Sequence, residues 1–422
     1  MIYVGVLVVI ATFYAIIKKY EARMVLFAAG LVMCLCAGNI QALITNVSNT
    51  MVHKTLVPTI CTVMGFSYVM RYTKCDKHLV TAISSVITKF KVVLVPLAIL
   101  ITWWINIPIP SAAGCAAAVG SILIPTMMAA GVHPAMAAAA VMAGTWGSAI
   151  SPGTSHNPVV AKLANTDVMT VIMNEAPAAI ITSFIVIAAL TAICIFTKEG
   201  PSEERRQAYL AAKEGSESED FSVNPIYALV PLVPLALLVM GSKQFHILPS
   251  VNVQTAMITG TLLALIVTRV NPQEVTKEFF KGCGDAYGGV MGLIIAAGVF
   301  TTGMAAIGLT GALINFMKGS ASIAKIAGAF GPWLIAVLSG SGDAAALAFN
   351  NAITPHAEQF GMTIMNLGSM AQMTGAIGRS MSPVAGAAII CAQMAGVNPM
   401  EITKRNGIPM LIGVISFLVL FG

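Results

Sequence analysis

The chain has 422 residues, of which 57% are hydrophobic and only 9% are charged, and its mean hydropathy is +0.85. Soluble domains carry about a quarter charged residues, so this composition excludes a water-soluble domain and indicates an integral membrane protein. The net charge of +6 is typical of the cytoplasmic loops of such a protein and does not indicate a nucleic-acid partner. The eight cysteines show no metal-binding spacing, and we expect no bound cofactor.

Apolar runs of roughly 20 residues predict membrane-spanning helices. In the first half, spans are expected near 2–17, 25–45, 54–71, 134–168 (interrupted) and 177–196. Residues 198–224 then form a linker, because the stretch 198–220 alone holds 11 of the 40 charged residues. In the second half, spans are expected near 225–241, 252–269, 286–305, 362–396 (interrupted) and 407–421.

Two further apolar stretches are broken by short polar motifs: 92–130 by "IPSAAG" and 323–360 by "SGSGDA". If both are re-entrant hairpins, every Lys/Arg cluster falls on the cytoplasmic face, as the positive-inside rule requires. This topology places the linker in the cytoplasm and both termini in the periplasm of a bacterial inner (plasma) membrane protein.

The two halves resemble each other. The segment "MAGTWGSAISP" (142–152) aligns without gaps on "MTGAIGRSMSP" (373–383), and the hairpin motifs fall in matching order. Five spans per half give the halves opposite orientations. We therefore predict an all-α polytopic fold of two inverted-topology repeats, 1–197 and 225–422, each with a re-entrant hairpin and a broken helix, as in secondary transporters.

Helix breaks at bilayer depth are tolerated only beside protein or a water-filled cavity. Here they carry helix-start signals: Ser151, Asn157 and Ser382 each precede a proline, an N-cap pattern. Ser111 and Asp343 precede the Ala-rich second arms of the hairpins. Half-helices starting after 111–114, 157, 341–343 and 382 would direct unsatisfied N–H groups and positive dipole ends at an anion with two carboxylates, and the unwound carbonyls could hold a cation.

Four side chains each allow more than one interpretation. Arg379 either pairs with a substrate carboxylate or bonds local carbonyl groups. Asp343 is a helix cap, a cation ligand or a proton carrier. His156 either titrates near neutral pH or satisfies the loop backbone, and Asn350 either faces the site or bridges helices.

The second half resembles the anaerobic C4-dicarboxylate carrier family (DcuC type) through "AAGVFTTGMAAIGLTGALI", "SGSGDAAALAF" and "GRSMSPVAGAAIICAQMAGVNPMEITKRNGIPMLIG". That family is similar to the ion-transporter superfamily of elevator-type carriers, which implies a dimeric scaffold around moving hairpins and broken helices. The resemblance implies substrate-binding roles for Ser111, Gly114, Ser151, Thr154, Ser155, Asn157, Ser341, Gly342, Asp343, Arg379, Ser380 and Ser382. His156 and Asn350 complete the expected site, with a possible sodium site near Ser111, Ser151, Asn157, Asp343 and Ser382.

The sequence thus predicts a homodimeric, elevator-type carrier of succinate, fumarate, malate or aspartate, driven by H⁺ or Na⁺ or by exchange. A carrier of another small organic anion, mono- or tricarboxylate, is the alternative if Arg379 is structural. A channel is a third alternative, but a channel does not need paired hairpins. An intramembrane hydrolase could draw on Ser339, Ser341, His156 and Asp343, but these residues lie in different repeats, so no enzyme is expected.

Overall fold

The computed structural model describes residues 1–18, 20–54, 56–87, 93–212, 222–241, 247–249, 251–312 and 321–421. Throughout these residues the regular elements are helices, in agreement with the predicted all-α class. Five of the described helices are long and apolar enough to cross a membrane: Ala112–Ala129, Val168–Phe196, Pro272–Ala306, Ser322–Ser339 and Pro399–Phe421.

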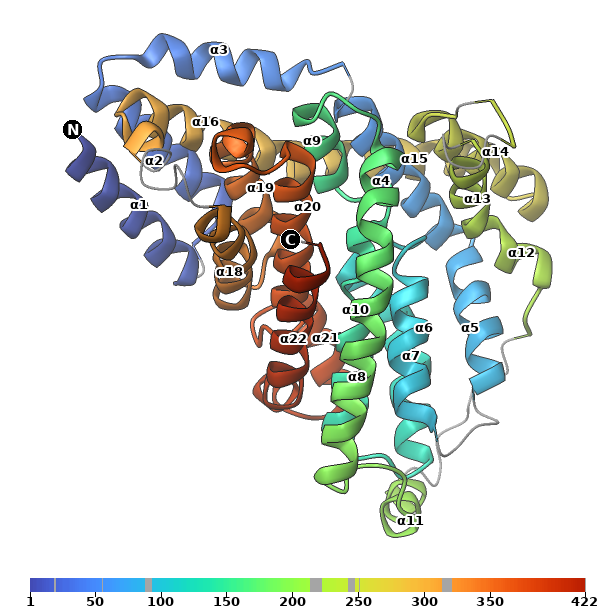
Figure 1. Cartoon of the computed structure of the whole chain (residues 1–422). Helices are drawn as coiled ribbons and strands as arrows, with labels where there is room; N and C mark the ends of the chain where they lie inside the picture. Colours follow the sequence, from blue (N-terminus) through green and yellow to red (C-terminus); the bar gives the residue numbers. More distant parts are fainter. Residues whose placement is uncertain are drawn as a thin grey trace.

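A central group of helices contains the hairpins and the interrupted segments of both halves (Figure 1). The first half supplies α6 (Leu94–Ile105), α7 (Ala112–Ala129), α8 (Pro134–Gly144), α9 (His156–Leu163) and α10 (Val168–Phe196). The second half supplies α18 (Ala321–Ser339), α19 (Gly342–Ala352), α20 (Ile364–Arg379), α21 (Gly386–Ala395) and α22 (Pro399–Phe421). The halves interlock, because α7 packs on α21, α9 on α19 and α20, and α10 on α22.

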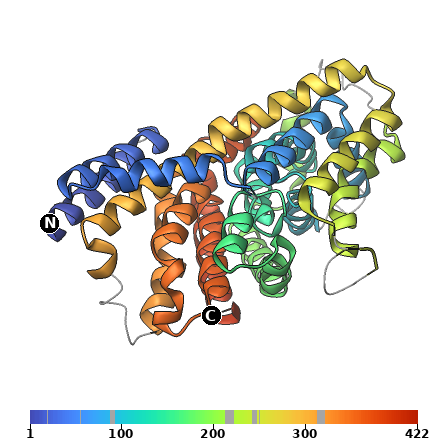
Figure 2. The same ribbon diagram turned by 90° about the horizontal axis from the view of Figure 1, so that it is seen from above.

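An outer group of helices flanks the central group at two ends (Figure 1). At one end lie α1 (Ile2–Ile17), α2 (Ala22–Cys36), α3 (Ile40–Met51) and α16 (Gly292–Ala306). Toward the other lie α4 (Leu56–Tyr72), α5 (Cys75–Ile87), α12 (Pro225–Leu229), α13 (Val233–Met240), α14 (Val253–Thr268) and α15 (Pro272–Ala286). A π-helical turn, Tyr287–Met291, joins α15 to α16, and Figure 2 shows the resulting long helix running across the molecule.

Four predicted spans have different bounds in the structure, and one of them, the span near 407–421, begins at Pro399. The span near 25–45 is two helices, because Gly38 adopts a left-handed conformation (φ 68°) after α2 and Asn39 caps α3. The span near 286–305 is only the end of the long helix, which starts at Pro272. The span near 177–196 begins at Val168, where Asp167 caps α10.

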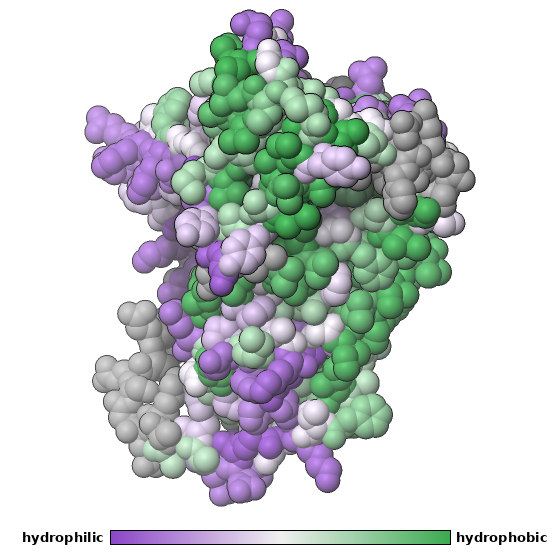
Figure 3. Space-filling view, turned by 90° about the vertical axis from the view of Figure 1, so that its left-hand side faces the viewer, coloured by the Kyte–Doolittle hydropathy of each residue, from purple (hydrophilic) through white to green (hydrophobic). Residues whose placement is uncertain are grey.

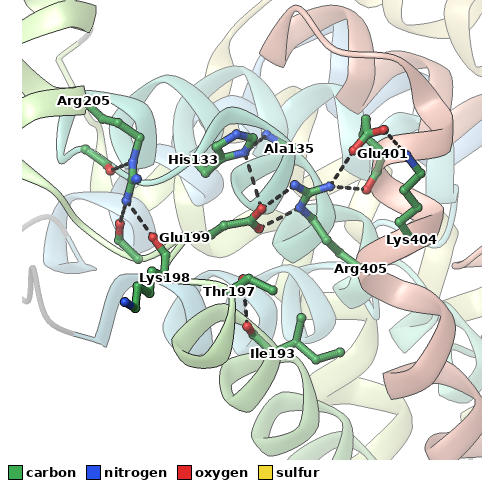
Figure 4. A network of polar contacts seen from close by, with 12 residues as sticks. His133, Ala135, Ile193, Thr197, Lys198, Glu199, Arg205, Glu401, Lys404 and Arg405 are labelled. Atoms are coloured by element: carbon green, nitrogen blue, oxygen red, sulfur yellow. Dashed lines mark hydrogen bonds and ion pairs between the residues drawn. The ribbon is translucent and has the colours of Figure 1, made fainter.

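The predicted linker 198–224 contains one described helix, α11 (Glu203–Ala212), and residues 213–221 of it lie outside the described residues. A polar network fastens its start to the central group (Figure 4). The Arg405 guanidinium of α22 makes a two-pronged ion pair with Glu199, and it also bonds Glu401. Arg205 Nε donates to the Gly131 carbonyl at 2.9 Å, so the linker is tied to both halves.

The surface carries many exposed apolar side chains, as expected for a protein in lipid. On α1, for example, Tyr3, Leu7, Ile10 and Tyr14 are all more than half exposed. Figure 3 shows an apolar expanse on one face, with hydrophilic side chains above and below it. This distribution fits a band of lipid contact between two polar surfaces.

Candidate functional site

The first interruption, residues 145–155, separates α8 from α9 and is closed by one buried amide. Asn157 Nδ2 donates to the carbonyl groups of Ala149 and Ser151, both at 2.8 Å. From the hairpin tip, Asn106 Oδ1 accepts the backbone N–H of Ser148 at 2.7 Å. Backbone carbonyls freed by the break are thus satisfied inside the protein, as an interruption in a membrane protein requires.

The second interruption, residues 380–385, separates α20 from α21. The Asn406 amide of α22 bridges it to the first half, because its Nδ2 donates to the Ser380 carbonyl at 3.1 Å and to the Ala139 carbonyl at 3.2 Å. Ser382 is 1% exposed, and its Oγ accepts the Val384 N–H at 3.4 Å.

The helix starts differ in part from the predicted ones. Asn157 is not an N-cap: α9 begins one residue earlier, at His156, and the Asn157 amide turns inward to the interruption. Ser382 is not an N-cap either, since α21 begins at Gly386. No helix starts at Pro152 after Ser151, whose Oγ accepts the Gly153 N–H within a turn.

The hairpin arms begin where the sequence predicts. Ser111 caps α7, with its Oγ accepting the Gly114 N–H at 3.1 Å. Ser341 caps α19 through the Ala344 N–H at 3.2 Å, which places Gly342 and Asp343 in the first turn. Asp343 is therefore not the cap, and its carboxylate is free to point elsewhere.

The two halves pack their glycines in the same way. Gly147 and Gly378 are aligned in the sequence repeat, and a Cβ atom on either would strike the carbonyl oxygen of a tryptophan, 2.0 Å from Trp103 and 2.6 Å from Trp333. Trp103 and Trp333 each lie on the first arm of their own hairpin, α6 and α18. Each hairpin is thus pressed against the interrupted segment of its own half.

Polar side chains of both halves meet between the interruptions. His156 Nε2 lies 3.4 Å from Asp343 Oδ1, with His156 2% and Asp343 48% exposed. Arg379 Nη2 donates to the Thr145 carbonyl at 2.7 Å, and Thr145 Oγ1 lies 3.3 Å from Ser380 Oγ. Three buried polar atoms here, Arg379 Nε, His156 Nδ1 and Ser155 Oγ, have no hydrogen-bond partner in the described part of the chain.

Other predicted residues lie apart from these contacts. Asn350 is fully buried, and its amide links Gly368 to Thr354. Ser151 lines a small hollow against α4 and α13, and Ser111 and Gly114 line another small hollow beside Arg71. Of the five residues named for a sodium site, the hydrogen bonds join only Asn157 and Ser151 directly.

Sequence analysis missed a buried acid next to the first interruption. Glu175 on α10 is 0% exposed, and both its carboxylate oxygens accept from Gln372 Nε2, at 3.0 and 2.8 Å. The same Nε2 donates to Asn157 Oδ1 at 2.7 Å. A lone acid inside an apolar run was the signal available in the sequence, because ionisable groups at such positions are functional candidates by default.

Two solved structures resemble this fold at low sequence identity. MtrF of Neisseria gonorrhoeae matches with a TM-score of 0.59 and 13% identity, over 93% of this chain and 84% of that chain. The YdaH transporter of Alcanivorax borkumensis matches with a TM-score of 0.58 and 14% identity, over 91% and 88% respectively. At this identity the likeness concerns the fold alone.

Sequence relatives are more specific. A Haemophilus influenzae protein named only as an uncharacterized transporter is 41% identical over 273 residues, 63% of this chain and 97% of that protein. The anaerobic C4-dicarboxylate transporter DcuC of Escherichia coli K12 is 30% identical over 229 residues, about half of each chain. The model of the DcuC family, described as the C4-dicarboxylate anaerobic carrier, matches residues 2–422. The chain therefore belongs to the DcuC family of membrane transporters.

Proposed function

We propose that the protein is a secondary carrier of C4-dicarboxylates that binds its substrate between the two interruptions. The observation that carries the proposal is Arg379. Its guanidinium reaches across from the second half to the Thr145 carbonyl of the first, and its buried Nε has no partner among the described residues. A guanidinium whose buried Nε–H has no acceptor suits a carboxylate, which can take two parallel hydrogen bonds from such a group.

The α19 start supplies the second half of the argument. Its N-terminal N–H groups carry partial positive charge, and its first turn approaches His156 of the other half through Asp343. A substrate with two carboxylates matches two groups of donors held at separate points, the Arg379 guanidinium and the N–H groups of the α19 start, where the Asp343 carboxylate is turned to His156. The name of the E. coli relative gives C4-dicarboxylates as its substrates, which supports the same class here.

Transport follows in this proposal from movement of the central group against the outer group. Interruptions and hairpins all lie in the central group, so a substrate bound there can travel with it as one body. The similar packing of Gly147 and Gly378 supports two related halves, and the Lys/Arg distribution supports their opposite orientation in the membrane.

The test is counterflow of labelled succinate in proteoliposomes of the purified protein, with fumarate, malate, aspartate, butyrate and citrate as competitors. We expect C4-dicarboxylates to compete and butyrate and citrate to fail. Arg379→Ala should abolish counterflow, and Arg379→Lys should keep only a small part of it, because an ammonium cannot form the two-pronged pair.

The matched control is Arg206→Ala, which removes an exposed arginine of the linker helix that pairs with Glu203. It should leave counterflow unchanged. If Arg379→Ala inserts, purifies and exchanges succinate with unaltered affinity, Arg379 has no part in binding. Competition by butyrate or citrate instead of succinate would point to a carrier of another organic anion.

A further inference from the structure

Glu175 occupies an unusual environment for a carboxylate. It lies in α10, a helix apolar enough to span a membrane, and none of its surface is exposed. Its oxygens accept from the Gln372 amide, the neutral Ser369 hydroxyl is its other polar neighbour, and no basic side chain of the described residues lies within 4 Å. A charged carboxylate deprived of water and of a counter-ion is strongly disfavoured, whereas a neutral carboxyl group is not.

The neighbouring elements supply no hidden charge. Helices α6 and α8 and the 3-10 turn Gly147–Ile150, all packed on α10, have no titratable side chain. On α9, His156 contacts Asp343; Lys162 is exposed. On α20, Arg379 bonds Thr145, and on α22, Glu401, Lys404 and Arg405 belong to the linker network. The remaining titratable side chain of α10 itself is Cys194, more than five turns away.

The orientation of the Gln372 amide is fixed by the interruption. Asn157 Nδ2 is held by two carbonyl acceptors, so Asn157 Oδ1 must face Gln372 and must accept from its Nε2. This leaves Gln372 Oε1 buried with no donor among the described residues. A neutral Glu175 carboxyl group would bring an O–H donor to this buried cluster, which a carboxylate cannot.

We infer that Glu175 is the site that binds the coupling proton. The step is reversible protonation: a Glu175 carboxylate oxygen takes one H⁺ from water and becomes a neutral carboxyl group, and the dicarboxylate stays charged. This inference rests on the proposed function and assigns its driving ion and the residue that carries it. The second half has no equivalent acid: when 163–177 is aligned with 394–409 so that Pro177 matches Pro409, Gly407 occupies the position of Glu175.

Coupling to substrate runs through three side chains. Glu175 and Asn157 share the Gln372 Nε2, and Asn157 holds the loop that leads into His156, the contact of Asp343. With Glu175 neutral, the packed arrangement seen here is stable and can move across the bilayer. With Glu175 charged, an arrangement that admits water to the carboxylate is favoured, so proton release and the opening of the site occur together.

The test compares two modes of transport in proteoliposomes clamped at zero membrane potential. For one proton per substrate, an imposed gradient of one pH unit gives about tenfold accumulation of succinate in the wild type. Glu175→Gln is permanently neutral, and we expect it to keep succinate counterflow but to accumulate no succinate under the gradient. Asp167→Asn, at the exposed start of the same helix, should behave like the wild type.

The outcomes separate the two proposals. Absence of succinate counterflow in the wild type contradicts the proposed function. Counterflow without pH-driven accumulation, accumulation driven by a sodium gradient alone, or wild-type accumulation by Glu175→Gln contradicts the assignment of the proton to Glu175. If Glu175→Gln does not fold, proton uptake is measured on adding succinate to wild-type protein in weakly buffered detergent, at a pH alkaline enough that Glu175 is charged before succinate is added. About one proton per bound succinate supports the assignment, and none overturns it.

Discussion

In both interruptions a helix breaks and an asparagine amide bonds the loop carbonyl groups, but the polar side chains around the two breaks differ. At the first, Asn157, Gln372 and Glu175 form a fully buried chain of hydrogen bonds that satisfies the loop and ends in an acid. At the second, Arg379, the last residue of α20, reaches across to the Thr145 carbonyl and keeps an unused donor. In the mechanism proposed here the two breaks have different roles, with the proton site at the first and the anion site at the second.

The difference also shows that similar glycine packing in the two halves does not make their polar sites equivalent. Gly147 and Gly378 keep the same close packing in both halves because the backbones need it. The side chains around them are free to diverge once each loop is held by an amide, Asn157 in one case and Asn406 in the other. Shared geometry thus coexists with separate chemistry.

The largest effect, on the recovery of folded protein, is expected from substitutions at the two closely packed glycines. Gly147→Ala and Gly378→Ala should each prevent recovery of folded protein, because the new Cβ meets a backbone carbonyl at 2.0 or 2.6 Å that cannot move aside, a cost above about 3 kcal/mol. Size-exclusion chromatography in detergent measures this. Gly331→Ala is the control, since nothing lies within 4 Å of its Cβ. Recovery equal to that of the control would show that the close contacts are not required.

Removing the two amides that hold the loops should destabilise the protein to different extents. Asn157→Ala frees two carbonyl groups and one Gln372 hydrogen bond, and we expect it to destabilise the protein by about 3 kcal/mol. Asn406→Ala frees two carbonyl groups that are bonded at longer distances, and about 1 kcal/mol is expected. Thermal unfolding of the two variants in the same detergent gives the order, and a reversed order would contradict this view of the first interruption.

A smaller effect concerns the contact between the halves. Asp343→Asn removes a negative charge near Arg379 without changing the Ser341 cap, so the site becomes more attractive to a dianion. We expect the apparent KM for succinate to fall about threefold, with folding unaffected. A raised KM would mean that Asp343 serves instead to position His156.

The smallest effect is expected in the linker network, where burial lowers the pKa of His133 below its ordinary 6.5 although Glu199 opposes the shift. The unfolded chain then binds the proton more readily, so stability falls as the pH drops through 6.5. Protonation also removes Nδ1 as acceptor of the Ala135 N–H. His133→Asn keeps a cap and should flatten this pH dependence in thermal unfolding. Solvent reaches 39% of the side chain, so the change is smaller than those above.

Much of the fold could be predicted from residues with strong local preferences. The run of Gly, Ser and Pro after Gly144 and after Arg379 predicted both interruptions, and Ser111 predicted the start of α7 because a hydroxyl before an Ala-rich run is a good cap. Asn157 and Ser382 were wrong as caps. A residue before proline resembles a cap in sequence, whereas the competing demand, two loop carbonyls in need of a donor, is visible only in three dimensions.

The candidate site was harder to predict where partners are distant. Gln372 and Glu175 are 197 residues apart, and no sequence motif around either residue predicts their contact. Arg379 was identified because a charge inside an apolar span is conspicuous by itself. Glu175 is equally conspicuous and lies in the segment 163–177 that aligns with 394–409, yet the sequence analysis assigned roles only to residues of the hairpin tips and the breaks.

The long helix of the outer group has a mechanical consequence. Its 35 residues extend about 52 Å, well beyond the roughly 30 Å of a hydrocarbon layer, so it must lie steeply inclined or emerge from the bilayer. Its α15 part packs on α4, and its α16 part packs on α2. The long helix therefore holds α4 and α2 at a fixed distance from each other. Only the π-helical turn, with open space beside Gly288 and Gly289, offers it a place to flex.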